Sequence, residues 1–221
     1  MNVKKIFLDL DDTILDTFRY LIKWHNQPYP YDCLESLDIY DKTCHYRKQP
    51  GESSTRESLS LLGLSYEKCW KSLPTVFWTT IPMFPWASMY IEHCERLAGK
   101  ENVYILTRQI PTKDCSGGKV EWVNQNLPEY IDRLIICRKK HAVVDGHSLL
   151  IDDCEKNEED FNRCGKSKNF YLFPSFLNKR RDMFFDIAGY TRSDPYKGHS
   201  SVKARAHNNI LTEINKKFLE L

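Results

Sequence analysis

Several features that mark common protein classes are missing from this chain of 221 residues. No apolar run approaches the roughly 20 residues that cross a bilayer. The eight cysteines include no CxxC pair, and their spacing fits no common zinc module. Neither a P-loop nor a GxGxxG motif is present, which argues against kinases and dinucleotide-dependent enzymes.

The chain also lacks a charge excess of either sign. Thirty-two Lys and Arg residues face thirty Asp and Glu residues, so the formal net charge is only +2. That balance argues against a nucleic-acid footprint over the whole surface, and a hydrophobic content of 41% argues against disorder. The N-terminal MNVKK and the short apolar run after it look like neither a signal peptide nor a transit peptide. We therefore expect a cytoplasmic protein with reduced thiols and no membrane association.

The pattern that is present is an alternation of strands and helices. Four short apolar runs predict buried strands at residues 3–9, 103–106, 133–137 and 149–151. Apolar residues at helical spacing predict helices over 86–98 and 118–127. The alternation from about 84 to 174 predicts an α/β fold with a parallel sheet and right-handed crossovers.

The segment 16–83 shows no buried-strand signal, although it lies between the first two predicted strands. We interpret it as a helical lobe, 16–83, inserted into a core that is formed by residues 1–15 and 84–221. Near the C-terminus, residues 208–221 have an amphipathic pattern that predicts a final helix, with Asn208 as its N-cap.

Polar residues follow each predicted strand. In an open α/β sheet the ligand crevice lies outside the carboxyl ends of the strands. We expect these residues there: Asp9, Asp11, Asp12, Thr107, Arg108, Lys140, Asp152 and Asp153. Two carboxylates about 4 Å apart repel by about 4 kcal/mol at an effective dielectric constant of about 20, and a divalent cation removes that penalty. Because the donors are all oxygen, the pattern favours Mg²⁺ over zinc, and Thr107 with Lys140 suits phosphoryl oxygens.

Each of these features has an ordinary structural explanation when taken alone. An Asp-Asp pair after a strand is often a turn or a helix cap, and a lone lysine is usually on the surface. The phosphate-site interpretation depends on the combination, because three separate apolar runs each end in the required chemistry.

Four motifs in order resemble those of the haloacid dehalogenase-like (HAD) phosphatases. DLDDT at 9–13 matches their DxDxT signature, ILTR at 105–108 their second motif, Lys140 their third and LLIDD at 149–153 their fourth. Over roughly 119–153 the chain is similar to the 5′(3′)-deoxyribonucleotidases of that superfamily, with a weaker similarity around 81–85. The resemblance implies a Rossmann-like HAD core with a small inserted helical cap.

The resemblance also implies site roles. Asp9 would be the nucleophile that forms an aspartyl-phosphate, and Asp11 the general acid and base. Thr107 and Lys140 would bind phosphoryl oxygens. Mg²⁺ would be held by the metal residues Asp9, Asp11 through its backbone carbonyl, and Asp152, with Asp153 orienting the metal shell. Two departures are Asp12-Thr13, where the deoxyribonucleotidases commonly have Gly-Val, and Arg108, where they often have Ser.

The cap is expected to determine the substrate. Phe18 lies near the predicted hinge, and Phe77 and Trp78 lie where the cap returns, so these rings could stack on a nucleobase while Arg108 grips a phosphate. Most aromatic residues at helical spacing belong to a core instead. The expected function is a Mg²⁺-dependent phosphomonoesterase whose partner is a small-molecule nucleotide, a (deoxy)ribonucleoside monophosphate. Two alternatives stay open: a nucleic-acid 3′-end phosphatase using the basic runs 178–181 and 197–207, and a catalytically idle interaction module. A homodimer also stays open.

Overall fold

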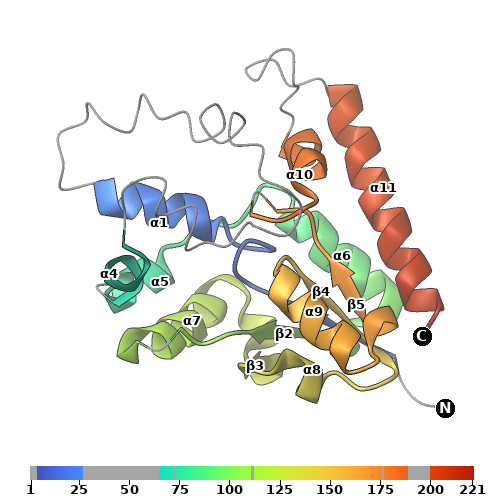
Figure 1. Cartoon of the computed structure of the whole chain (residues 1–221), viewed down its shortest axis with the longest axis horizontal. Helices are drawn as coiled ribbons and strands as arrows, with labels where there is room; N and C mark the ends of the chain where they lie inside the picture. The colour runs from blue at the N-terminus through green and yellow to red at the C-terminus, as the bar shows by residue number, and fades with distance from the viewer. Residues whose placement is uncertain (1–3, 27–64, 72, 111, 176, 189–199) are drawn as a thin grey trace.

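The computed structural model describes residues 4–26, 65–71, 73–110, 112–175, 177–188 and 200–221. Within these ranges the strands are β1 (Lys5–Leu8), β2 (Val103–Thr107), β3 (Leu134–Ile136), β4 (Ser148–Asp152) and β5 (Phe170–Leu172). They form one sheet in the order β3-β2-β1-β4-β5, and every neighbouring pair is parallel (Figure 1). The predicted α/β fold with a parallel sheet is confirmed, and β5 is a strand that the sequence analysis did not predict.

The strand order determines where a ligand crevice can form. From β1 the chain proceeds to β2 and β3 on one side, and then returns to β4 and β5 on the other side. The register pairs Leu8 with both Ile105 and Ile151, so the three central strands end at the same edge. A crevice outside the carboxyl ends of the strands is expected where the direction of winding changes, which here is between β1 and β4.

Helices cover both faces of the sheet (Figure 1). The side chains of the strands alternate between the two faces. Ile6 and Leu8 belong to a large core cluster with residues of α6 (Ala87–Ala98), α7 (Lys113–Asn126) and α11 (Ser200–Leu219). Phe7 belongs to a smaller cluster with Phe161 of α9 (Glu155–Arg163), beside the short helix α8 (Lys140–Val143). Further elements are α10 (Arg181–Ala188) and the 3₁₀ turns η2 (Lys100–Asn102), η3 (Pro128–Arg133) and η4 (Ser167–Asn169).

The predicted helices are present with different starts. The helix predicted over 86–98 is α6, whereas α7 starts five residues before the predicted 118. The final helix begins at Ser200, so the prediction of Asn208 as its N-cap is wrong. Asn208 lies inside α11, where its carbonyl accepts a hydrogen bond from Thr212 (2.8 Å). The apolar pattern of 208–221 reflects the buried residues Ile210, Ile214 and Phe218 in the second half of α11. It therefore did not show that the helix begins at Ser200.

Three described helices lie in the predicted cap segment: α1 (Thr17–Asn26), α4 (Tyr66–Lys71) and α5 (Thr75–Thr79). Much of that segment, 27–64, lies outside the described residues, so the cap boundaries 16–83 stay a prediction. The described part is joined to the core by α5, which packs on α7. Indole Nε1 of Trp122 on α7 donates to the carbonyl of Ile81 (2.8 Å), and the large core cluster includes residues from both sides of this contact.

Two other expectations concern thiols and membranes. Six cysteines fall within the described residues, and all are free: Cys69, Cys94, Cys115, Cys137, Cys154 and Cys164. Cys33 and Cys44 lie outside those residues. None of the described helices combines the length and apolar character that crossing a bilayer requires.

Candidate active site

Asp9 is the first residue after β1, and the end of the strand fixes its position. Its backbone N–H donates to the carbonyl of Ile151 (3.0 Å), which continues the pairing with β4 by one residue. Its side chain is buried, and carboxylate Oδ1 accepts from the backbone N–H of Leu10 (2.8 Å). Among the described residues the contacts of this carboxyl lie on Oδ1, which leaves Oδ2 for a ligand or for bond formation.

Lys140, at the start of α8, connects two strand ends. Its ammonium lies 2.6 Å from Asp9 Oδ1 and donates to Asp152 Oδ2 at 2.7 Å. The lysine side chain is 1% exposed, so a surface role for it is excluded in this structure. Burial alone would lower the pKa of Lys140, but the two carboxylates outweigh it and hold that pKa above its ordinary value. The ammonium is therefore a permanent positive charge between β1 and β4.

Asp152 ends β4 and is completely buried. Besides Lys140, its carboxylate accepts from the backbone N–H of Cys154 (2.8 Å) and from the side-chain amide of Asn157 (2.8 Å). Three donors thus hold this carboxylate in one orientation, which a metal ligand or an electrostatic anchor requires.

Three carboxylates converge at this edge of the sheet. One oxygen each from Asp9, Asp152 and Asp153 lie within 4.8 Å of one another. Lys140 neutralises one of these three negative charges, so the cluster still attracts a divalent cation. Because the donors are all hard oxygen atoms, they fit Mg²⁺, which accepts a few carboxylates and completes its shell with water and substrate oxygens.

Burial and mutual repulsion perturb this cluster strongly. Desolvation raises the pKa of Asp9 to about 7; Lys140 opposes that rise, whereas Asp152 and Asp11 add to it. Desolvation also raises the pKa of Asp153 well above its ordinary range, with repulsion from Asp12, Asp152 and Asp9 as further causes. A cation bound among these oxygens would favour the ionised forms.

Asp11 lies in a second network at the same edge. Its Oδ1 accepts from the hydroxyl of Thr17 (3.0 Å), and its Oδ2 is contacted by the ammonium of Lys119 and, at 3.5 Å, by the hydroxyl of Thr107. Lys119 also donates to Thr107 Oγ1 (2.9 Å) and to the carbonyl of Arg108 (2.8 Å). The structure therefore brings the first and second predicted motifs together through one lysine.

Lys119 is the site residue that the sequence analysis missed. It lies in the middle of α7 and is 1% exposed, and its ammonium lies 5.5 Å from the centre of the Trp78 ring. The available signal was its position on the helix that directly follows the Thr107 strand end. The residues around Lys119, which include Gly117 and Gly118, show no clear helical pattern in the sequence, so the direction of the lysine side chain could not be predicted.

Asp12 has a positive φ of 52°, the one such non-glycine residue in the described chain. Aspartate tolerates this left-handed conformation better than most residues because its short side chain bonds locally. Here the Asp12 carboxylate accepts from the backbone N–H of Phe18 (2.9 Å), at the start of α1. Asp12 can thus replace the Gly that the deoxyribonucleotidases commonly have here, and its side chain also holds the start of α1 in place.

The structure corrects the expected roles of the three aromatic residues. Phe18 is 4% exposed, and Phe77 and Trp78 are 0% exposed. Phe77 packs edge-on against Trp78 (centroids 5.0 Å apart), and Trp78 stacks on Trp70 at 6.0 Å. No ring face of the three is open to a nucleobase, so we assign them to the core. Aromatic residues at helical spacing look the same in a sequence whether a ligand or another helix covers them.

Arg108 is exposed directly after Thr107, at the carboxyl end of β2. Its backbone carbonyl belongs to the Lys119 network. The prediction that it contacts substrate stays a prediction.

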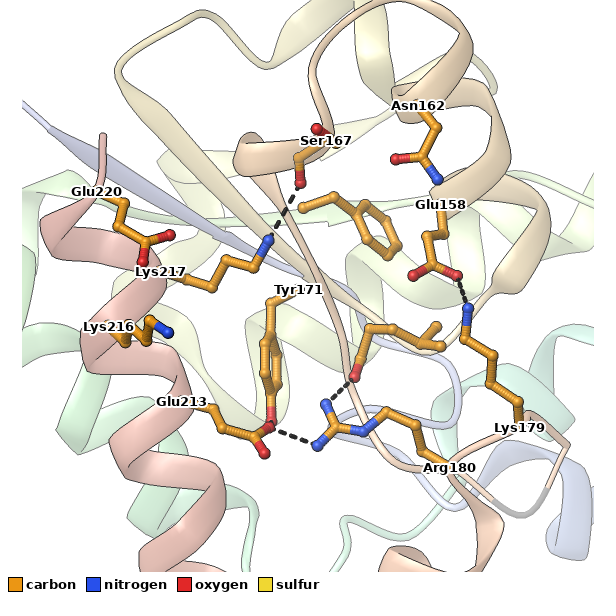
Figure 2. A pocket seen from close by; sticks show the side chains of 12 residues that line it. Glu158, Asn162, Ser167, Tyr171, Lys179, Arg180, Glu213, Lys216, Lys217 and Glu220 are labelled. Carbon is orange, nitrogen blue, oxygen red and sulfur yellow. Dashed lines mark hydrogen bonds and ion pairs between the residues drawn. The ribbon is translucent and has the colours of Figure 1, made fainter.

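The basic run at 178–181 lies beside a different hollow. A pocket of about 410 Å³ lies along the outer edge of β5, between α9 and α11. Figure 2 shows the side chains that line it. Lys179 contacts Glu158 there, and Arg180 contacts Glu213. Two of the basic side chains are thus neutralised by nearby carboxylates, and the pocket contains none of the strand-end carboxylates. The second basic run, 197–207, lies partly outside the described residues.

Comparisons with known proteins give distant structural likenesses. No protein-family model and no curated protein sequence matches the chain. Among solved structures, the HAD-hydrolase YfnB from Bacillus subtilis bound to magnesium aligns at 15% identity and a TM-score of 0.37. That alignment covers 70% of this chain and 79% of YfnB. A hydrolase from Streptococcus pneumoniae TIGR4 aligns at 15% identity and a TM-score of 0.43, covering 83% of this chain and all of that one. At these TM-scores the similarity carries no argument about activity, and the α/β assignment stands on the sheet topology of this chain itself.

Proposed function

We propose that this chain is a Mg²⁺-dependent phosphomonoesterase of the HAD type, with Asp9 as its nucleophile. The observation that carries the proposal is the convergence of Asp9, Asp152 and Asp153, with one oxygen of each within 4.8 Å of the others, and the buried ammonium of Lys140 in contact with the first two. A core that served only packing would have no reason to bury two carboxylates and one cation beside a third, half-buried carboxylate, because desolvation costs several kcal/mol per buried ion.

Asp9 provides the attacking oxygen. Leu10 N–H and Lys140 hold Oδ1, so the carboxylate plane is fixed while Oδ2 is presented to phosphorus. Attack forms the bond between Asp9 and phosphorus and breaks the bond to the leaving oxygen. The product is an aspartyl-phosphate and a free alcohol, so that one difficult displacement becomes two easier ones.

Asp11 moves the protons. In the first step it gives its proton to the leaving oxygen; in the second it takes a proton from water as that water attacks phosphorus and releases Asp9. The ammonium of Lys119 contacts one oxygen of the Asp11 carboxyl group, and the hydroxyl of Thr17 donates to the other, so the two contacts hold this group in place for both proton transfers. This assignment gives the buried Lys119 a role in orienting the acid and base.

Thr107 and Lys140 are positioned to contact the phosphoryl oxygens. Lys119 donates to the Thr107 oxygen, and the hydroxyl of that threonine makes a long contact of 3.5 Å with Asp11 Oδ2, which it can exchange for a hydrogen bond to a phosphoryl oxygen. When bound, Mg²⁺ would be held by Asp9, Asp152, Asp153 and the Asp11 carbonyl, and would neutralise charge on the phosphoryl group.

The proposed substrate is a nucleoside monophosphate, preferentially a deoxyribonucleotide. Support for this finer assignment comes from the sequence similarity to the 5′(3′)-deoxyribonucleotidases over roughly 119–153. The three buried aromatic rings form no part of the proposal. Arg108, exposed directly after β2, is the residue that we propose contacts a substrate group beyond the reacting phosphate.

The chemistry is tested with p-nitrophenyl phosphate and Mg²⁺ on wild type, Asp9→Asn and Asp145→Asn. Asp145 is a matched control because its carboxylate lies before β4, at the opposite end of that strand from Asp152. We expect Asp9→Asn to retain below about 1% of wild-type turnover with its fold intact, and Asp145→Asn to retain most of it. Mass spectrometry should find phosphate on the peptide containing Asp9. Full turnover in Asp9→Asn would refute the assignment of the nucleophile.

The substrate class is tested by phosphate release from 5′- and 3′-nucleoside monophosphates, in ribose and deoxyribose forms, and from a 3′-phosphorylated oligonucleotide. We expect the highest kcat/KM for a deoxyribonucleoside monophosphate. Faster release from the oligonucleotide would instead favour the nucleic-acid end phosphatase.

A further inference from the structure

The segment after β5 crosses the carboxyl edge of the sheet next to the three-carboxylate cluster. Phe173 N–H donates to the carbonyl of Asp152 (2.9 Å), which continues the β4–β5 pairing to the end of β4. Five residues later, Asn178 is 5% exposed although it belongs to a connecting segment. A buried amide in such a place needs hydrogen-bond partners, and those partners identify its role.

The Asn178 side chain uses both of its N–H groups on backbone carbonyls. Nδ2 donates to the carbonyl of Asp153 (2.8 Å) and to the carbonyl of Phe173 (2.7 Å). Its Oδ1 accepts from the backbone N–H of Arg180 (2.9 Å). Rotating the amide by 180° would place its oxygen against carbonyl oxygens, so the hydrogen-bond partners determine its orientation.

The same segment also holds the side chain of Asp153. The hydroxyl of Ser175, which is 1% exposed, hydrogen-bonds the Asp153 carboxyl. Asn178 therefore fixes the backbone of Asp153, and Ser175 fixes its carboxyl group. Asp153 is the member of the cluster that Lys140 does not contact within the described residues, so this segment replaces the support that Asp9 and Asp152 obtain from that lysine.

We propose that Asn178 is a positioning residue that sets the place of the Asp153 carboxylate in the metal site. This inference depends on the proposed function, because it concerns the same three carboxylates. Outer partners of metal ligands typically contribute about 10- to 100-fold to metal affinity, since they fix the orientation of the ligand before the metal arrives. Loss of the amide would let the carboxylate of Asp153 move away from the oxygens of Asp9 and Asp152.

The segment has other attachments, so loss of the amide should loosen it locally and leave the fold intact. Arg180 donates to the carbonyl of Leu172 (2.6 Å) and contacts Glu213 of α11, as Figure 2 shows. The guanidinium also lies 5.0 Å from the centre of the Tyr171 ring. These contacts anchor the C-terminal end of the segment to β5 and α11 independently of Asn178.

The chain offers a closely matched control at the other end of the same strands. Asn169 is 2% exposed, and its Nδ2 donates to the carbonyls of Asp145 (3.0 Å) and Ser148 (2.8 Å). Asn169 and Asn178 thus each join two backbone carbonyls next to β4, one before the strand and one after it. Only Asn178 bonds to a residue of the three-carboxylate cluster.

The experiment compares wild type, Asn178→Ala and Asn169→Ala in full-length protein without substrate. Mn²⁺ is titrated calorimetrically into metal-free protein, and melting temperatures are measured in EDTA. We expect both variants to lower the melting temperature, because each loses two hydrogen bonds from the side-chain amide to backbone carbonyls. Asn178→Ala should raise the dissociation constant for Mn²⁺ about tenfold or more, whereas Asn169→Ala should leave it within about twofold of wild type.

Unchanged Mn²⁺ affinity in Asn178→Ala, with wild-type binding intact, would overturn the positioning role. An equal loss of affinity in Asn169→Ala would also overturn it, because general destabilisation would then explain both. If Asn178→Ala does not fold, Asn178→Ser is the substitute, since it also removes the amide, and an unchanged dissociation constant there has the same meaning. Absence of Mn²⁺ binding by the wild type would instead refute the metal site of the proposed function, and this inference with it.

Discussion

Replacement of Lys140 by methionine tests the electrostatics of the site most directly. The substitution keeps an unbranched side chain of similar length but removes the ammonium that lies 2.6 Å from Asp9 and 2.7 Å from Asp152. At an effective dielectric constant of about 20, each contact corresponds to a gross attraction of about 6 kcal/mol. The desolvation of the three groups offsets most of this, and breaking such a buried pair typically costs about 3–5 kcal/mol.

We therefore expect Lys140→Met to lose about 3–5 kcal/mol of unfolding free energy in EDTA at pH 8, which corresponds to a fall in melting temperature of roughly 10 °C. The deficit should shrink at pH 5, because protonation of Asp9 relieves the repulsion between the remaining carboxylates. Added Mg²⁺ should also reduce it, since a cation takes over the neutralisation. Turnover should be lost in all these conditions.

The assay is denaturant unfolding at both pH values, with and without Mg²⁺. Lys139→Met is the matched control, because Lys139 is the exposed neighbour that precedes α8. It should leave the free energy of unfolding within about 0.5 kcal/mol of wild type. If Lys140→Met matched that control at pH 8 in EDTA, the argument that the lysine neutralises buried carboxylates would be wrong.

Two further predictions concern the contact between α5 and α7 and the titration of Asp9. A Cβ on Gly118 would lie 2.4 Å from the Cβ of Trp78, so Gly118→Ala should destabilise the protein by about 1–3 kcal/mol. A Cβ on Gly117 would meet nothing within 4 Å, so Gly117→Ala should be neutral or should stabilise the protein by up to about 1 kcal/mol. Thermal melting checks both, and equal effects would contradict the packing. In metal-free protein the pKa of Asp9 in the folded state is about 7, which is above the ordinary value of 3.8. Between these two pH values the folded state binds a proton that the unfolded state does not. The free energy of unfolding should therefore fall as the pH rises from about 4 to 7. Denaturation at pH 5 and pH 7.5 in EDTA checks the sign; the contribution should vanish in Asp9→Asn, and an identical slope in that variant would contradict the shift.

The pattern of residues along the chain was sufficient to predict the strands and the polar residues at their ends, because both depend on residues that are close in sequence. Short apolar runs ending at Asp9, Thr107 and Asp152 indicated buried strands with polar ends, and parallel strands place such ends at one edge whatever else packs around them. The convergence of the carboxylates was predictable for that reason. The strand β5 was not predicted: it has three residues, as β3 does, but no charged residue directly follows its apolar run.

The remaining features were decided by which elements pack together, and a single sequence does not carry that information. Whether Phe77 and Trp78 face a ligand or a helix depends on α5 lying against α7, where Gly118 permits the close approach. The same packing turns Lys119 toward Asp11, although helical spacing alone does not say which face of α7 meets the sheet edge. Asn178 reaches Asp153 from 25 residues away in the chain, because the segment after β5 returns across the end of β4. The reactive groups follow from the order of residues along each strand, whereas the residues that hold them in place come from distant segments and are brought there by the tertiary fold.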